Sequence, residues 1–404
     1  MNTILHMAHL YPSKYNPSAG IFTFNQIKQL TKIGVKNIVT SPTPINIPFR
    51  NKKKQILYDT TNLDQQAVKS PVFYTRYIPI PFIPRMDLFR PLCDRFKGAF
   101  IIKHLKAHIH NIALIHAHFG TDGYESLWLK TKLNVPLITS FYGFDIETPY
   151  LYDTSRANKL FTEGDLFLVL SHDMAQRLLK KGCPENKIKV HRLGVDCKKQ
   201  FQYKERIRGQ KTTFLILSHF VEKKGIIYGI KAFSNIIKEY PNIELRIVGR
   251  GPLENKLKKE VKSMQLEDKI EFINNYEFPN PRECVLKEFH SNDIFVLPSV
   301  DVEGDYGGTP TVLMEVQATG MPCITTDVDA NSELVIDNVT GFVVNQKDTD
   351  ALAAKMIELI EKPDLCIKFG KNARAHIEKN FNEEIQVANL KNTYADIIKS
   401  YKEP

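Results

Sequence analysis

Short apolar strands alternate with amphipathic helices along this chain, and the alternation runs through two long segments. The first begins with a strand at residues 3–10, and the second restarts with a strand at residues 213–217. Between them, residues 198–211 are polar and basic, which is typical of a linker. Alternating strands and helices build parallel sheets with helices on both faces. The pattern therefore predicts an α/β protein with two Rossmann-like, doubly wound domains that face a central cleft.

The length of the chain agrees with this division. At 404 residues it exceeds what one hydrophobic core usually supports. We expect an N-terminal domain at residues 1–197, a linker at 198–211 and a second domain at 212–380. Residues 381–404 are expected to form a last helix that packs back on the N-terminal domain.

The composition, the cysteine pattern and the length of the apolar runs indicate a cytoplasmic protein. Apolar residues make up 43% of the chain and charged residues 25%, which is ordinary for a folded protein. The six cysteines are scattered without a C-x-x-C pair, which fits a reducing compartment and provides neither a zinc site nor a disulfide framework. The first residues are typical of a strand, not of a signal peptide, and no apolar run approaches the ~18 residues that a membrane span needs.

The net charge of +10 suggests an anionic partner. A positive charge of this size favours binding to nucleic acid, to an anionic membrane surface or to phosphorylated substrates. Zinc-finger spacing and RNP-like aromatic motifs are absent from the sequence, so nucleic acid is not expected. A basic cluster at 50–54 and a basic amphipathic helix at 86–110 fit peripheral binding to the inner face of the cytoplasmic membrane. The alternatives are a helix that packs on the core and a basic surface without an anionic partner.

The stretch from Leu297 to Asp327 combines a strand end, a glycine loop and a helix. Thr309 is a suitable N-cap, and Gly320 stands where a left-handed residue ends a helix. Gly307 and Gly308 leave backbone N–H groups free at the helix start, which is a ready phosphate site. The alternative interpretation is a tight strand-to-helix turn without a ligand.

Glu315 lies within the helix of this stretch, among apolar neighbours. A carboxylate there needs a partner, because the burial of an unpaired charge is costly. Together with the glycine loop, it predicts a nucleotide held through its phosphates and its ribose. A tolerated glutamate is the alternative.

His118 and Tyr142 follow two buried strands in the first half of the chain. Open α/β sheets bind ligands at the carboxyl ends of their strands, so both residues are candidates for a site. A histidine there can also be a satisfied structural residue. Lys224, in a loop of the second half, is by itself no more than a solvated lysine.

At this point the sequence resembles the retaining nucleotide-sugar glycosyltransferases of family 4, which have the GT-B fold. The resemblance covers nearly the whole chain, and the order and spacing of its motifs carry it. These motifs are the early Gly20 loop, H-A-H-F-G, F-Y-G-F-D, L-G-V-D, F-V-E-K-K-G, V-G-R-G-P and P-S-V-D-V-E-G-D-Y-G-G-T-P-T-V-L-M-E-V-Q-A-T-G-M-P. The resemblance implies transfer of a sugar from a nucleotide-sugar donor to a lipid-linked or saccharide acceptor in surface-polysaccharide synthesis.

The resemblance also implies roles for individual residues. Lys224 matches the lysine that binds the donor diphosphate, and Glu315 matches the glutamate that holds the ribose. His118 matches a histidine that faces the donor sugar. The remaining matches are the phosphate loop at Gly307, Gly308 and Thr309, and the glycines Gly20 and Gly249 near the donor.

Three positions depart from the family pattern. The first glutamate of the paired-glutamate motif should lie eight positions before Glu315, where this chain has Gly307. The arginine usually paired with the lysine is His219, which is only partly charged near neutral pH, and a common histidine is Tyr142. These changes keep open a catalytically weak homologue that binds a nucleotide sugar as a partner or scaffold. A sugar-nucleotide epimerase of the same fold is a further alternative.

The implied reaction needs stabilisation of the negative charge that builds on the leaving diphosphate. Lys224, a protonated His219 and the helix start at Thr309 provide this stabilisation in the predicted site, without a metal or another cofactor. Asp327 and Asp329 form a D-x-D that resembles a metal motif of another glycosyltransferase fold, but their place after a short strand indicates a loop.

Overall fold

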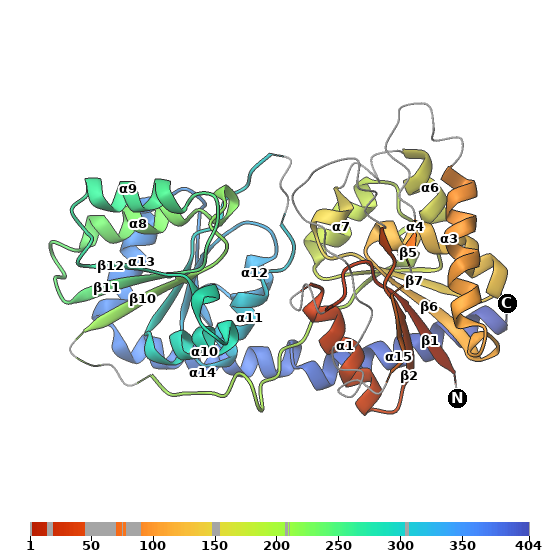
Figure 1. The fold of residues 1–404 in the computed structure, drawn as a ribbon. Helices are drawn as coiled ribbons and strands as arrows, with labels where there is room; N and C mark the ends of the chain where they lie inside the picture. Colours follow the sequence, from red (N-terminus) through yellow and green to blue (C-terminus); the bar gives the residue numbers. More distant parts are fainter. Residues whose placement is uncertain are drawn as a thin grey trace. The chain divides into compact units, whose positions relative to one another are not determined.

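The computed structural model describes residues 2–13, 19–44, 70–74, 76–77, 90–147, 154–206, 209, 211–303 and 307–403. For residues 43–44, 76–77, 90–94 and 154 it describes the backbone alone. The chain divides into two compact units (Figure 1). Unit 1 comprises Met1–Arg192 and Glu384–Pro404, and unit 2 comprises Leu193–Glu383. The basic cluster at 50–54 and the first residues of the expected helix at 86–110 lie outside the described residues.

Unit 1 is built on a parallel sheet whose described strands have the order β4-β2-β1-β6-β7-β8-β9. The strands of this sheet are β1 (Thr3–Met7), β2 (Lys36–Thr40), β4 (Val72–Phe73), β6 (Ile112–His118), β7 (Leu137–Ser140), β8 (Leu166–Val169) and β9 (Ile188–Val190). Two short strands, β3 (Thr43–Pro44) and β5 (Arg76–Tyr77), pair separately in parallel. Because β1 pairs with β2 on one side and β6 on the other, the strand order reverses direction between β1 and β6.

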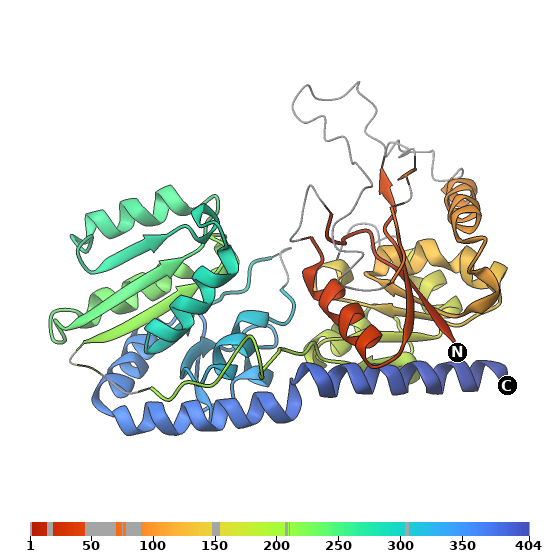
Figure 2. The same cartoon turned by 60° about the horizontal axis from the view of Figure 1, so that its bottom comes forward.

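Helices cover both faces of this sheet (Figures 1 and 2). They are α1 (Ile21–Lys32), α3 (Arg90–Leu105), α4 (Gly120–Leu133), α6 (Thr154–Glu163), α7 (His172–Lys180) and α15 (Glu383–Lys402). The last helix, α15, buries Val387, Leu390 and Ile398 in one hydrophobic cluster with strand residues such as Ile4 and Leu114. The end of the chain is therefore part of the core of unit 1.

Unit 2 repeats the same topology with the strand order β12-β11-β10-β13-β14-β15, again parallel throughout its described pairs. Its strands are β10 (Thr212–Leu217), β11 (Ile243–Val248), β12 (Ile270–Ile273), β13 (Ile294–Leu297), β14 (Cys323–Thr326) and β15 (Gly341–Val344). Its helices are α8 (Ile226–Ile236), α9 (Glu254–Ser263), α10 (Pro281–Ser291), α11 (Thr311–Ala318), α12 (Asn331–Leu334), α13 (Thr349–Glu361) and α14 (Pro363–Asn380). Its strand order reverses between β10 and β13.

The segment expected to be a linker packs on unit 2 instead. Phe201 is 1% exposed and Arg206 is 8% exposed. The Arg206 guanidinium donates to the carbonyls of Phe289 and Asn292 at the end of α10, at 2.6 and 2.9 Å. The polar composition that suggested a linker thus includes a cation that satisfies the last carbonyl groups of a helix.

Helix α11 begins later than expected. Its first residue is Thr311, and Pro310 precedes it in an extended conformation without a side-chain cap. Thr309 is therefore not the N-cap, because Pro310 itself is extended, with ψ of 101°, and takes the N-cap position. Gly320 is left-handed with φ of +81°, as expected. Among the helices in the described part of the chain, none is both long and apolar enough to cross a membrane.

Candidate active site

The strand order places candidate residues at the point of each sheet where ligands usually bind. In open α/β sheets this point lies outside the carboxyl ends of the two strands where the order reverses. In unit 2 these strands are β10, followed by the loop of His219 and Lys224, and β13, followed by the glycine loop. In unit 1 they are β1, followed by the Gly20 loop, and β6, which ends at His118.

Lys224 is held against the loop that follows β13. It ends a short 3₁₀ turn, and Gly225 follows with a left-handed φ of +58°. A Cβ on Gly225 would lie 1.8 Å from the carbonyl oxygen of Pro298, so only glycine permits this approach. The Val300 N–H also donates to the carbonyl of Lys223 at 2.9 Å. The turn therefore brings the half-buried Lys224 to the start of the stretch that leads into the glycine loop.

His219 and Gly249 lie at the ends of the neighbouring strands β10 and β11. Gly249 has φ of +140°, and a Cβ there would lie 2.0 Å from the carbonyl oxygen of Ser218. Gly249 thus lets the two strand-end loops pack closely. His219, next to Ser218, is exposed.

Gly307 makes room for a carboxylate from another segment. A Cβ on Gly307 would lie 2.0 Å from Oδ2 of Asp329, a half-buried residue with a left-handed φ of +49°. The family pattern has a glutamate at position 307. In this chain the carboxylate of Asp329, 22 positions later (329 − 307 = 22), lies where that side chain would begin. The sequence predicts only a loop at Asp329. Nothing in the local pattern indicates this contact.

The segment between Gly307 and α11 has polar groups that are available to a ligand. The hydroxyl of Thr309 is buried and has no hydrogen-bond partner within the described residues. The first N–H groups of a helix have no partner within the helix. Thr309, together with the adjacent Gly308 and the start of α11, therefore offers hydrogen-bond donors to an anion.

Glu315 has a partner, as the sequence requires, and the partner is Arg282 of α10. The two guanidinium nitrogens lie 3.0 and 3.2 Å from the two carboxylate oxygens. The Glu315 side chain is 16% exposed and that of Arg282 is 38% exposed. Burial raises the pKa of Glu315, and the positive charge of Arg282 opposes that rise. Arg282 also stacks over the ring of Phe201, 4.6 Å from its centroid.

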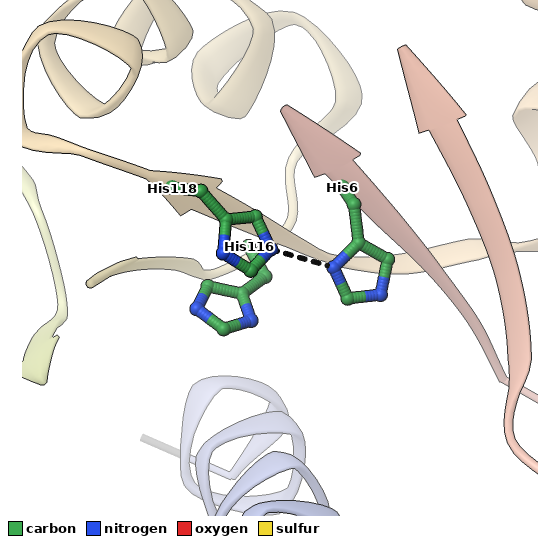
Figure 3. Close-up of side chains that lie close together, drawn as sticks. All are labelled: His6, His116 and His118. Atoms are coloured by element: carbon green, nitrogen blue, oxygen red, sulfur yellow. Dashed lines mark hydrogen bonds between the residues drawn. The ribbon is translucent and has the colours of Figure 1, made fainter. Parts of the chain in front are cut away.

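In unit 1, His118 belongs to a buried cluster with His6 and His116 (Figure 3). The Asn37 amide sets the direction of the hydrogen bonds in this cluster. Nδ2 of Asn37 donates to Thr31 and to the carbonyl of Val35. Its Oδ1 then accepts from Nε2 of His6 at 3.0 Å, which leaves Nδ1 of His6 to accept from Nε2 of His118 at 3.1 Å.

Tyr142 completes this chain. Its hydroxyl donates to Nδ1 of His118 at 2.6 Å. His116 bonds separately to Tyr394 of α15 at 2.6 Å and to Ser140 at 2.7 Å. Every ring nitrogen of the three histidines thus has a protein partner. One nitrogen from each ring lies within 4.8 Å of the others, close enough for metal ligands, but the hydrogen bonds already account for the arrangement.

The structure gives His118 a different setting from the one that the resemblance implies. Its side chain is fully buried, as are those of His6 and His116. Burial lowers the pKa of each, to about 4 for His6, so the cluster is neutral at pH 7. With both nitrogens occupied, His118 offers no free group to a sugar and is connected to the edge of the sheet through the half-buried Tyr142.

Asp145 is a further residue of this edge, and the sequence alone does not predict its contacts. It accepts from the backbone N–H groups of Gly120, Tyr142 and Gly143, at 2.8 to 3.1 Å. Burial raises its pKa to about 6, although these N–H groups favour the ionised form. Asp145 therefore joins the loops after β6 and β7. Its place at the end of the F-Y-G-F-D motif is the sequence signal that identifies it as a candidate.

Comparisons with known proteins identify the family. Residues 198–376 match the family described as "Glycosyl transferases group 1", and residues 25–199 match "Glycosyltransferase Family 4". A putative colanic acid biosynthesis glycosyltransferase of Salmonella typhimurium is 32% identical over 286 residues, 69% of this chain and 70% of the relative. The chain belongs to glycosyltransferase family 4. The family predicted from the sequence is confirmed.

Other relatives of this family 4 glycosyltransferase agree. An amylovoran biosynthesis glycosyltransferase of Erwinia amylovora is 30% identical over 279 residues, 68% of this chain and 67% of the relative. An Escherichia coli UDP-Gal:α-D-GlcNAc-diphosphoundecaprenol α-1,3-galactosyltransferase is 30% identical over 225 residues, 52% of this chain and 55% of the relative. The first is named for amylovoran biosynthesis, and the second for transfer to a sugar linked to diphosphoundecaprenol.

Solved structures confirm the GT-B fold. A glycosyltransferase of Rickettsia africae has a TM-score of 0.74 at 18% identity, covering 98% of this chain and 99% of that one. HepE of Anabaena, solved in complex with UDP-glucose, has a TM-score of 0.69 at 16% identity, covering 99% of this chain and all of that one. At such identities the likeness establishes the fold alone.

Proposed function

We propose that this family 4 glycosyltransferase moves a sugar from a nucleotide-sugar donor to a lipid-linked or saccharide acceptor in surface-polysaccharide synthesis, with retention at the anomeric carbon. The relatives named for colanic acid and amylovoran biosynthesis support the pathway class. The galactosyltransferase relative supports a nucleotide-sugar donor and a diphosphate-lipid acceptor.

The observation that carries the proposal is the joining of the Lys224 turn to the loop after β13. The backbone at Gly225 lies close to the carbonyl oxygen of Pro298, and the Val300 N–H donates to the carbonyl of Lys223. This contact fixes a lysine at the reversal point of the strand order in unit 2, where ligands of such sheets bind. The buried hydroxyl of Thr309 and the start of α11 follow along the same loop. A diphosphate is the ligand that this set of donors fits.

In the proposed reaction the bond between the anomeric carbon and the diphosphate oxygen breaks, and its electron pair leaves with the diphosphate. Charge on the leaving group is greatest in the transition state, so groups placed there lower the barrier. Lys224 supplies a positive charge, and His219 supplies another when protonated. Gly307, Gly308 and Thr309 supply neutral donors, and Glu315 accepts from the ribose. All these groups belong to the protein, so the proposal includes no essential metal.

Gly20 and Gly249 have a supporting part in this proposal. Gly20 is left-handed with φ of +58°, and a Cβ there would lie 2.1 Å from the carbonyl oxygen of Leu10. Each glycine lets a loop fold tightly within its own unit, Gly20 in unit 1 and Gly249 in unit 2. His118 acts through Tyr142, whose hydroxyl it orients.

The test begins with a donor screen. UDP- and GDP-sugars are compared for thermal stabilisation of the protein and for release of nucleoside diphosphate, with and without a saccharide acceptor. With the donor so found, Lys224→Ala should abolish transfer while the protein stays folded, because a charge-assisted contact that strengthens in the transition state is lost. Lys231→Ala, an exposed lysine of α8, is the matched control and should leave transfer unchanged. Near-normal turnover of Lys224→Ala would refute the proposed mechanism.

A second candidate function is a catalytically weak nucleotide-sugar-binding homologue that acts as a partner or scaffold. The glycine at position 307 and the histidine at position 219 favour it. The Asp329 carboxylate beside Gly307 weighs against it, because an acid still occupies that place. Binding of a nucleotide sugar without turnover in the donor screen would favour the scaffold.

We also propose that the enzyme works in the cytoplasm, at the inner face of the membrane. A lipid-linked acceptor would be presented at that surface, and the basic sequence supports attraction to anionic lipid.

A further inference from the structure

The loop after β14 in unit 2 brings a carboxylate to the glycine loop before α11. Asp329 lies three residues beyond the end of β14, between Val328 and Ala330, which are each 2% exposed. A Cβ on Gly307 would lie 2.0 Å from Oδ2, 2.7 Å from Cγ and 2.9 Å from Oδ1 of Asp329. The whole carboxylate therefore occupies the space that a side chain at position 307 would need.

Hydrogen bonds hold the loop of Asp329 in place on the sheet. The Thr326 hydroxyl donates to the carbonyl of Ser299, in the stretch after β13, at 2.6 Å. Asn331, 1% exposed, donates to the Thr326 carbonyl at 3.1 Å and to the Thr325 hydroxyl at 3.0 Å. The position of Asp329 is therefore fixed by buried neighbours within unit 2.

Helix α12 connects the same loop to the helix of Glu315. It begins two residues after Asp329 and lies beside α11 (Figure 1). Nε2 of the fully buried Gln317 in α11 donates to the carbonyl of Leu334 at the end of α12, at 3.0 Å. Asp329 and Glu315 are therefore held in fixed positions relative to each other.

The order of the groups in a nucleotide sugar matches the order of the proposed ligands along this segment. Glu315, the proposed ribose ligand, is the fifth residue of α11. Thr309 and the start of α11, the proposed diphosphate ligands, lie about one helical turn earlier. In the donor the diphosphate joins the ribose to the sugar, so the sugar lies beyond the diphosphate from Glu315. The residues on that side of the proposed diphosphate position are Gly307 and Asp329.

The charge of Asp329 suits a sugar and not a phosphate. Two anions repel each other, so a carboxylate weakens the binding of a diphosphate that it contacts. Sugar hydroxyl groups can donate hydrogen bonds, and a carboxylate has about four acceptor sites, so bonds within the protein leave acceptors for a hydroxyl. Asp329 is half-buried, and a hydrogen bond to a charged group is stronger where water is partly excluded.

We propose that the carboxylate of Asp329 accepts a hydrogen bond from a hydroxyl group of the donor sugar and so contributes to the selection of that sugar. It lies where the family pattern has a glutamate side chain, at position 307. A sugar without a hydroxyl at this place loses the hydrogen bond and is selected against. The contact lies within unit 2 and adds no covalent step to the reaction. Its assignment rests on the proposed glycosyl transfer.

Neighbouring acids of this region have other contacts. Oδ1 of Asp327 accepts from the backbone N–H of Gln346 at 2.9 Å. Oδ2 of Asp301 accepts from Nε2 of Gln346 at 2.7 Å. The two acids of the D-x-D therefore differ: Asp327 is exposed and supports a loop contact, whereas Asp329 lies against the glycine loop.

The first experiment compares wild type, Asp329→Asn and the control Asp327→Asn, using the donor and acceptor found for the wild type. Asparagine tolerates the left-handed φ of +49° at position 329, so the backbone keeps its conformation. Asp329→Asn should lower kcat/KM for the nucleotide sugar about 10- to 150-fold, the range for loss of a hydrogen bond to a charged group. The Kd for UDP or GDP should change by less than about twofold, because these ligands lack the sugar. Asp327→Asn should change neither quantity.

An exchange of the two side chains tests whether they share one place. Gly307→Glu alone should lower transfer, because its Cβ would lie 2.0 Å from Oδ2 of Asp329. Asp329→Gly removes the acid, and glycine suits the left-handed φ. In the double variant Gly307→Glu/Asp329→Gly the new glutamate has that space, so kcat/KM should be about tenfold or more above that of Asp329→Gly. A purely structural role of Asp329 predicts no such recovery.

The outcomes separate this contact from the proposed function. If the wild type transfers sugar and Asp329→Asn keeps the same kcat/KM, Asp329 does not bind the sugar. A Kd for UDP or GDP that rises as much as kcat/KM falls would equally overturn the assignment, since the loss would then lie at the diphosphate or in the fold. A folded double variant that is no more active than Asp329→Gly would also overturn it, and Asp329→Asn decides the question if the double variant does not fold. If the wild type transfers no sugar from any donor, the proposed function itself fails, and the assignment of Asp329 fails with it.

Discussion

Replacement of Glu315 by glutamine separates the role of the carboxylate in the fold from its proposed role in binding. A carboxylate has about four acceptor sites, and Arg282 uses two of them. The remaining sites can accept from two ribose hydroxyls. Glutamine keeps the shape but has only one oxygen, and its amide nitrogen would face either a guanidinium N–H or a ribose hydroxyl. We therefore expect Glu315→Gln to weaken nucleotide binding.

The expected loss of affinity follows from the cost of a charged hydrogen bond. Hydrogen bonds to charged groups contribute about 1.5–3 kcal/mol. At about 1.4 kcal/mol for each factor of ten, this corresponds to a Kd roughly 10- to 150-fold higher.

The effect on folding should be much smaller. Burial raises the pKa of Glu315, so the carboxyl favours the fold below its unfolded pKa, near 4.5, and this contribution is lost as the pH rises through the folded pKa. At neutral pH glutamine removes that cost. It also loses the pairing with Arg282, but this arginine is 38% exposed, and solvent screens the pair. The two effects oppose each other, and we expect the free energy of unfolding to change by about 1 kcal/mol or less.

Calorimetric titration with UDP and GDP, together with urea unfolding, measures both quantities. Glu283→Gln is the matched control, because Glu283 is exposed in the same helix as Arg282 and should change neither. Unchanged affinity of Glu315→Gln for the nucleotide that binds the wild type would refute the ribose assignment. A loss of several kcal/mol in stability would refute the account of the ion pair.

Three further predictions concern single positions or segments. His219→Arg restores the usual family residue and a permanent charge, so sugar transfer, measured as kcat, should be preserved or raised; a large loss would argue against a role in charge stabilisation. Gly225→Ala should lower the free energy of unfolding in urea more than Gly34→Ala. Both glycines are left-handed, but of the two only Gly225 would bring a Cβ to 1.8 Å from a backbone oxygen, that of Pro298. Equal losses would contradict the packing argument. The protein should sediment with anionic liposomes at low salt and be released as salt rises, and alanine at the basic positions of 50–54 should reduce binding; a protein that stays in the supernatant at low salt refutes membrane docking.

The sequence by itself determined the elements and their kind. Short strands between longer amphipathic helices indicate parallel sheets, because the period of apolar residues is a local property of the chain. Glycines at strand ends and helix starts indicate tight turns for the same local reason, as Gly249 after β11 and Gly225 before α8 show with their positive φ angles. The family followed from the order of such motifs. The roles of Lys224, His219 and the glycine loop in the reaction stay predictions.

Only the tertiary structure decided which side chains meet. Asp329 lies against Gly307, His9 pairs with Asp122, and Asn37 sets the direction of hydrogen bonds to His6. The partners come from different loops or strands, and strand order makes them neighbours: β1 lies between β2 and β6, although β6 is far along the chain. A hydrogen bond of this kind depends on distance in space, which periodicity does not encode. Local patterns can therefore predict a strand or a turn, whereas the choice of partner for a buried polar group is made when the sheet assembles.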